Sequence, residues 1–228
     1  MRSRTGRWLC LLAFSFAALS APVRSAEIDA TLAAWLNAQT NLQTWTARVT
    51  QTRSLKSLAK PLVAQGRVWF AAPKQFRWEI GEPAVTIAVR QPDQMLVIYP
   101  KLKRIERYPL TGTQAGPWKD TLSLLEAGFP RSSAELEARF KVIAQSASNG
   151  VHEVVLQPKS ASAQRLMPRI TIAFATADFA LRATELQFAD GSLLRNDFTN
   201  PEFNPKLDPL LFEPKLEADY RMVDPLSR

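Results

Sequence analysis

The sequence holds few of the side chains on which metal sites, disulfides and most nucleophilic enzymes depend. Its 228 residues include one cysteine, Cys10, and one histidine, His152. The single histidine lacks the further histidines and cysteines of a Cys/His zinc site, because the one cysteine lies near the start of the chain. The eight glycines are spread singly, so a glycine-rich phosphate-binding loop is absent as well. We therefore expect no cofactor, no metal, no catalytic residue and no enzymatic activity.

The excess of basic over acidic side chains is modest. The chain has 29 lysines and arginines against 21 acidic residues, a formal net charge of +8. Four of the arginines lie in residues 1–26, so a chain without that segment would carry about +4. The remaining charges are scattered instead of forming the patch or stripe of a nucleic-acid-binding domain. A nucleic-acid partner is not expected.

Residues 1–26 have the pattern of a secretory signal peptide. Arginines precede an apolar run of 14 residues that begins at Trp8 and is too short to span a bilayer. Cys10 lies inside this run, whereas a lipid-attachment cysteine would follow it. We expect cleavage near residue 26, which leaves a mature chain, residues 27–228, with no thiol and no lipid anchor. That mature chain contains no linker or repeat and is predicted to be a single domain.

Hydrophobic periodicity predicts a mostly β protein. Apolar residues at helical spacing indicate an amphipathic helix over residues 28–45, and from Thr46 the period changes to two. About eleven strands follow, the clearest over residues 63–71, 75–80, 85–90, 95–99, 102–108, 140–145, 151–157, 170–175, 181–188 and 193–198. Two more helices are expected, one over residues 118–127 and a short one after the capping-box pattern at residues 132–135.

Short turns between the strands predict an antiparallel meander. The dipeptide Asp190-Gly191 between two apolar segments is a strong hairpin signal. Eleven strands in one open sheet must curl, and three helical pieces can cover only the concave side. The proline-rich tail that begins at Pro201 should wrap the surface or add an edge strand.

One face of the predicted sheet is continuously apolar. Phe76, Trp78 and Ile80 alternate with the charged Arg77 and Glu79, and the neighbouring strands repeat this pattern. The face is either the core beneath the helices or, because three short helices are a thin cover, the wall of a cavity.

The polar candidates have simpler structural explanations. His152 lies in an alternating strand, which favours a core histidine over a ligand or a base. The carboxylate pairs Glu135/Glu137 and Asp190/Asp197 fall at a helix start and in a hairpin. The basic residues of segment 101–107 alternate onto one polar strand face, with a partner-docking patch as the alternative.

Several motifs occur together in a fixed order. The most specific is Pro-Lys-Gln-Phe-Arg-Trp-Glu at residues 73–79, followed by Glu82-Pro83. Further matching stretches lie at residues 45–51, 65–70, 156–159, 170–172 and 212–214. This ordered set covers nearly all of the mature chain and resembles the periplasmic outer-membrane lipoprotein carrier family, the LolA-like proteins.

The resemblance implies an unclosed, curled antiparallel β-barrel with a helical lid over a hydrophobic cavity. It also implies a monomer in the periplasm that takes the acyl chains of lipoproteins from an inner-membrane exporter and passes them to an outer-membrane acceptor. At about 0.8 kcal/mol per methylene, a sixteen-carbon chain costs on the order of 12 kcal/mol to expose to water. On this hypothesis the cavity is lined by Trp69 or Phe70, Phe76, Trp78, Ile80, Val85, Ile87, Leu96, Ile98, Ile170, Ile172 and Phe174, with Trp35, Leu36, Leu122 and Leu125 on the lid.

Two departures from the family pattern leave other functions open. Ala72 stands where many members have an arginine thought to hold the lid shut, and residues 93–99 replace an expected Gly-x-x-x-Trp-x-Tyr. Arg77 is nearby, but alternation places it outside the cavity as a solvated strand residue. The alternatives are a carrier of another amphiphile, such as a glycolipid or a lipid-linked precursor, and a periplasmic sensor that uses the same fold to bind a signalling protein.

Overall fold

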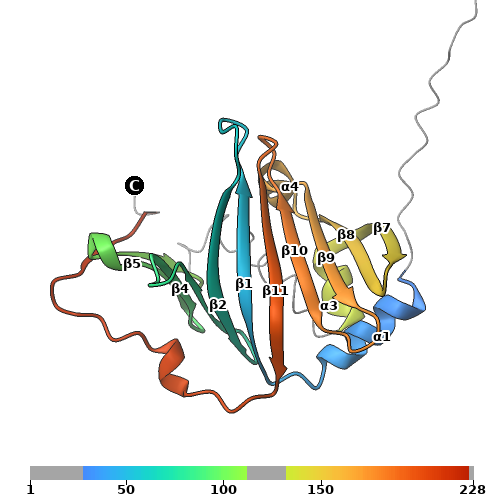
Figure 1. The fold of residues 1–228 in the computed structure, drawn as a ribbon, viewed down its shortest axis with the longest axis horizontal. Coiled ribbons are helices and arrows are strands. Elements are labelled where there is room, and N and C mark those ends of the chain that lie inside the picture. The colour runs from blue at the N-terminus through green and yellow to red at the C-terminus, as the bar shows by residue number, and fades with distance from the viewer. Residues whose placement is uncertain (1–27, 112–131, 226–228) are drawn as a thin grey trace, which may run out of the picture.

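The computed structural model describes residues 28–111 and 132–225, which form one curled sheet of twelve strands with helices against one of its faces (Figure 1). The strands lie in the order β12-β6-β5-β4-β3-β2-β1-β11-β10-β9-β8-β7. Two antiparallel meanders, β1–β6 and β7–β11, therefore meet where β1 pairs with β11. The parallel pair in this sheet is β12 on β6.

The elements have the following bounds. The helices are α1 (Ala30–Gln39), α3 (Ser133–Arg139) and α4 (Ala161–Leu166), with short 3-10 turns η1 (Pro100–Leu102) and η4 (Pro209–Phe212). The strands are β1 (Thr44–Ser54), β2 (Leu62–Ala71), β3 (Gln75–Ile80), β4 (Thr86–Arg90), β5 (Gln94–Tyr99), β6 (Arg104–Pro109), β7 (Phe140–Ser148), β8 (Val151–Pro158), β9 (Arg169–Ala175), β10 (Leu181–Gln187), β11 (Leu193–Phe203) and β12 (Arg221–Val223).

The predicted strands and the mainly β fold class are confirmed. The tail supplies an edge strand, β12, which makes twelve strands where about eleven were expected. The first helix is shorter than predicted, because the chain from Thr44 onward pairs with β2 and joins the sheet. The predicted signal peptide and the predicted helix over residues 118–127, with Leu122 and Leu125, lie outside the described residues.

Local sequence accounts for the turns and caps. In the β10–β11 hairpin Gly191 has φ +85°, and the Asp190 carboxylate accepts a hydrogen bond from the Ser192 amide at 2.8 Å. The Ser132 hydroxyl caps α3 by accepting from the Glu135 amide at 3.0 Å, as the capping-box pattern predicts. Gly66 allows β2 and β3 to approach closely, since a Cβ there would lie 1.9 Å from a backbone oxygen of β3.

The core lies on the face that carries the helices, which we call the inner face. The Asp29 carboxylate caps α1 by accepting from the Leu32 amide at 2.8 Å. The fully buried Trp35 stacks on Phe174 of β9, with ring centroids 4.7 Å apart, and donates its indole N–H to the Phe179 carbonyl. Helix α1 thus closes the β8–β9 end of the inner face.

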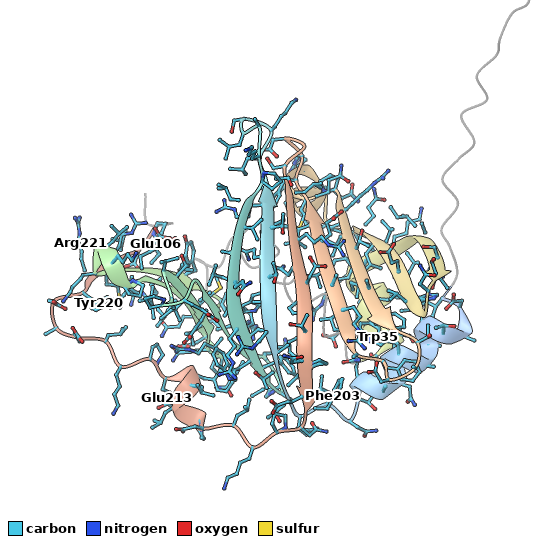
Figure 2. All side chains as sticks on the ribbon, in the orientation of Figure 1. Trp35, Glu106, Phe203, Glu213, Tyr220 and Arg221 are labelled. Atoms are coloured by element: carbon cyan, nitrogen blue, oxygen red, sulfur yellow. The ribbon has the colours of Figure 1, made fainter. Side chains whose placement is uncertain are left out.

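The opposite, outer face of β3–β6 is covered by the C-terminal strap, residues 204–225. Figure 1 shows this segment leaving the lower end of β11, running below β4 and β5 in the view and then turning up beside β5. The Arg77 guanidinium donates to the Leu211 carbonyl at 3.0 Å, and Arg107 makes a two-pronged ion pair with Asp224 at 2.7 and 2.8 Å. In Figure 2 Tyr220 and Arg221 lie beside Glu106, where the strap becomes β12.

A small second core holds the strap to the sheet. Leu96, Ile98 and Ile105 are buried on the outer face, with Ile87 and Tyr220 packed against them. The outer face of this part of the sheet is therefore apolar too, and the strap shields it from water.

The stacking of α1 on β9 should be a large part of the stability. We expect Trp35→Ala to lower the free energy of unfolding by about 3–5 kcal/mol, because it removes a fully buried ring and a hydrogen bond. Urea unfolding followed by circular dichroism measures this. The matched control on the exposed side of α1, Asn37→Ala, should change it by less than about 0.5 kcal/mol. Equal effects of the two variants would contradict the packing.

The second core gives a similar test on the outer face. Leu96→Ala should lower the free energy of unfolding by about 2–5 kcal/mol, because it leaves a hole beneath the strap. Leu102→Ala is the control, since Leu102 is 65% exposed. Hydrogen exchange of the β12 amides should speed up in the first variant alone. Unchanged exchange there would show that the strap does not depend on this core.

Candidate functional site

Strand register decides which side chains face the inner side. Trp78 of β3 pairs with Val68 of β2 and Ala88 of β4, and Ala88 pairs with Val97 of β5. Directly paired residues share a face, so these four side chains point to the inner side. Ile87, on β4 next to Ala88, points to the outer side.

The inner face encloses a cavity of about 480 Å³. Its walls come from β1–β5 on one side and β9–β11 on the other, around the meeting point of the two meanders. The apolar lining residues include Phe76, Trp78, Ile80, Val85, Ala88, Met95, Ile170, Leu181, Leu186, Leu194 and Phe198, and the polar ones are Gln51, Arg53, Thr86, Tyr99, Thr184 and Asn196. This size is typical of a pocket for a small organic ligand.

The cavity reaches solvent at the end of the β1–β2 hairpin. Leu62 and Val63, which line it there, are 49% and 63% exposed. At the other end of the same strands Trp45 of β1 and Phe70 of β2 are buried in the core. A ligand therefore has an apolar floor near Phe198, which Trp45 and Trp78 contact edge-on, and a mouth near Leu62.

Five of the residues predicted from the sequence line this cavity: Phe76, Trp78, Ile80, Val85 and Ile170. Five others belong to the packed core of the inner face instead of to the cavity wall. These are Phe70, Ile172, Phe174 and the α1 pair Trp35 and Leu36, of which Phe174 and Trp35 stack on each other. The predicted Leu122 and Leu125 lie outside the described residues.

The prediction that Ile87, Leu96 and Ile98 line the cavity is wrong. The register places all three on the outer face, where they pack under the C-terminal strap. The prediction failed because both faces of β4 and β5 are apolar. Alternation shows which side chains share a face, but it does not show which of two apolar faces is the inner one. Val85 lines the cavity because it precedes β4, where the turn interrupts the alternation.

Trp69 also lies on the outer face. It pairs with Arg77 across β2 and β3, and the Arg67 guanidinium lies 5.7 Å from its ring centroid. Arg77 is outside the cavity as predicted, but it is not a solvated residue. Its side chain is 15% exposed and bonds Glu79 at 2.6 Å as well as the strap.

Sequence reasoning missed several wall residues. Met95, Leu181, Leu186, Leu194 and Phe198 all lie in strands that were predicted correctly. Strand pairing puts these side chains on the same face as the residues that were predicted to line the cavity; Leu186 of β10, for example, pairs with Ile170 of β9. The pairing of strands that are distant in sequence was the missing information.

A polar cluster lies beside the cavity at the β5–β6 edge. The Glu106 carboxylate accepts hydrogen bonds from the Tyr99 hydroxyl at 3.2 Å and the Tyr108 hydroxyl at 2.9 Å, and Arg104 bonds its other oxygen at 3.0 Å. Burial, together with the Glu106 charge, raises the pKa of both tyrosines above the ordinary value. Both hydroxyls therefore stay protonated at neutral pH and act as donors.

His152 lies on the inner face of β8, against α1. It is 3% exposed, its ring is 5.2 Å from that of Phe174, and its Nε2 atom is 3.4 Å from the Asp29 carboxylate. Over residues 28–111 and 132–225, no three histidine, cysteine or acidic side chains are grouped as metal ligands would be. In the same residues no helix has both the length and the apolar character needed to cross a membrane.

Comparisons with solved structures find matches at low sequence identity. An uncharacterized conserved protein from Thermus thermophilus matches with a TM-score of 0.49 and 10% identity, over 83% of this chain and 94% of that one. A LolA superfamily protein from Nitrosomonas europaea matches with a TM-score of 0.39 and 9% identity, over 83% and 99%. The MucA/MucB complex of Pseudomonas aeruginosa matches with a TM-score of 0.41 and 14% identity, over 84% and 62%.

Comparison with curated proteins finds no match. Comparison with protein families finds one whose description is outer membrane lipoprotein carrier protein LolA, and it matches residues 40–215. That range runs from the end of α1 through all the strands that wall the cavity and into the C-terminal strap. The chain belongs to the LolA family of outer membrane lipoprotein carrier proteins.

Proposed function

We propose that the protein carries outer-membrane lipoproteins across the periplasm, with their acyl chains in the inner-face cavity. The observation that supports this most directly is the cavity itself, which is about 480 Å³, has mostly apolar walls and is open at one end. Family membership supports the cargo, and the signal-peptide pattern of residues 1–26 supports the compartment. An inner-membrane exporter and an outer-membrane acceptor are the partners that this role requires.

The physical need for such a carrier is large. Burying an acyl chain of sixteen carbons is worth on the order of 12 kcal/mol, so unaided transfer through water is negligible. A carrier must also release its cargo, so the affinity of the cavity for the acyl chains must not exceed the affinity of the acceptor for them. The open mouth suits this requirement, because a chain can leave along its own axis without unfolding the sheet.

A direct test is native mass spectrometry and lipid extraction on the mature protein, residues 27–228, purified from a periplasm. We expect an acylated protein or lipid to co-purify. A free glycolipid as the sole cargo would keep the carrier role and change its substrate, whereas a bound polypeptide without acyl chains would favour the sensor alternative. Protein that stays empty when offered acyl chains would contradict the proposal.

Filling the cavity from its wall should abolish binding. Ala88 lies on the inner face beside Trp78, so Ala88→Trp places an indole where the acyl chain would lie. We expect at least a tenfold loss of affinity for a fluorescent fatty-acyl probe, with a melting temperature that is little changed. The control is Ala33→Trp on the exposed side of α1, which should bind normally. Full binding by the cavity variant would place the acyl site elsewhere.

A further inference from the structure

Three uncharged polar side chains form a hydrogen-bonded row across the wall of the apolar cavity. The Gln51 amide of β1 donates to the Asn196 carbonyl oxygen of β11 at 3.1 Å, and the Asn196 amide donates to the Thr184 hydroxyl of β10 at 3.2 Å. All three line the cavity, and Asn196 is only 4% exposed. We call this set the polar row.

The polar row still has hydrogen-bond donors to offer. Each amide group carries two N–H bonds, and the row uses one of Gln51 and one of Asn196. The Thr184 oxygen accepts, so its O–H is left to donate. Among groups that an amphiphile brings next to its acyl chains, the carbonyl oxygens of esters and amides only accept, so they match a wall rich in donors.

Arg53 adds a positive charge two residues farther along β1. It faces the same side as Gln51 and lines the cavity at its mouth, where it lies opposite Leu62 of the neighbouring strand β2. Within the described part of the chain Arg53 makes no ion pair, whereas Arg48, on the outer face of the same strand, lies 3.6 Å from Glu82. Two residues along a strand correspond to about 7 Å.

From the core to the mouth the cavity thus presents an apolar floor, the polar row and then a single cation. We propose that the polar row binds the ester or amide carbonyls of the cargo and that Arg53 binds an anionic group just beyond them. This inference rests on the proposed acyl-chain function and adds the chemistry of the cargo near its chains. The anion is a phosphate of a lipid headgroup or a carboxylate near the acylated end of a lipoprotein.

The first experiment compares two phosphatidylglycerols with equal chain lengths, one with ester and one with ether linkages. Displacement of a fluorescent fatty-acyl probe measures both affinities on the unmodified mature protein. We expect the ester lipid to bind about fivefold more tightly, because only it can satisfy the donors of the polar row. Thr184→Val, which replaces the hydroxyl by a methyl of equal size, should reduce this preference. Thr50→Val, on the outer face of β1, should not.

The second experiment tests the cation. Arg53→Gln should weaken binding of the anionic ester lipid about threefold, an effect that falls with added salt, and should leave phosphatidylcholine with the same chains almost unchanged. Arg48→Gln makes the same charge change outside the cavity and should have no effect. A second arm uses synthetic diacylated cysteine peptides that carry Glu or Gln after the cysteine. If Arg53→Gln no longer prefers the Glu peptide over the Gln peptide, the anion is the protein carboxylate. If it no longer prefers phosphatidylglycerol over phosphatidylcholine, the anion is the lipid phosphate.

The outcomes separate this inference from the proposed function. Equal affinity for ester and ether lipids would overturn the inference, and so would equal effects of Arg53→Gln and Arg48→Gln. In either case the proposed carrier function would stand as long as both lipids bind. No binding of any acylated probe by the unmodified protein would overturn both.

Discussion

The pairing of β1 with β11 is the contact on which the rest of the structure depends, because it joins two meanders into one sheet. The inner side chains of β1 then serve two purposes along one strand. Trp45 and Val49 are buried in the core, and Gln51 and Arg53 on the same face line the cavity. A slip of one residue would turn all of them to the outer side, so the core that fixes the register also fixes the site.

The cavity exists because the described helices cover only part of a very wide sheet. Helix α1 packs through Trp35 on Phe174 of β9, and α3 and α4 add Leu136 and Ala163 to the same core. The described helices α1, α3 and α4 pack at the β7–β9 end of the sheet, whereas Trp78, Ala88 and Met95 on the inner face of β3–β5 line the cavity. That part of the sheet offers its apolar surface to a ligand.

The apolar outer face of β4 and β5 is covered by another part of the same chain. Leu96 and Ile98 are covered by the C-terminal strap, which Arg77 and Arg107 fasten by hydrogen bonds and an ion pair. The two apolar faces of β4 and β5 thus have different fates. The outer face is covered by the C-terminal strap, with a pocket of about 330 Å³ left between Ile87, Ile98 and the strap, and the inner face stays open at the mouth beside the exposed Leu62.

The sequence alone determined the strands, the turn at Asp190-Gly191, the cap at Ser132 and the family, because these depend on local periodicity and on short motifs. It also determined part of the cavity wall, at Phe76 and Trp78. Only the tertiary structure decided that Ile87 and Leu96 face the strap, and that Gln51, Thr184 and Asn196 meet in one row. The reason is physical: alternation fixes which residues share a face within a strand, whereas pairing between strands distant in sequence fixes which face it is.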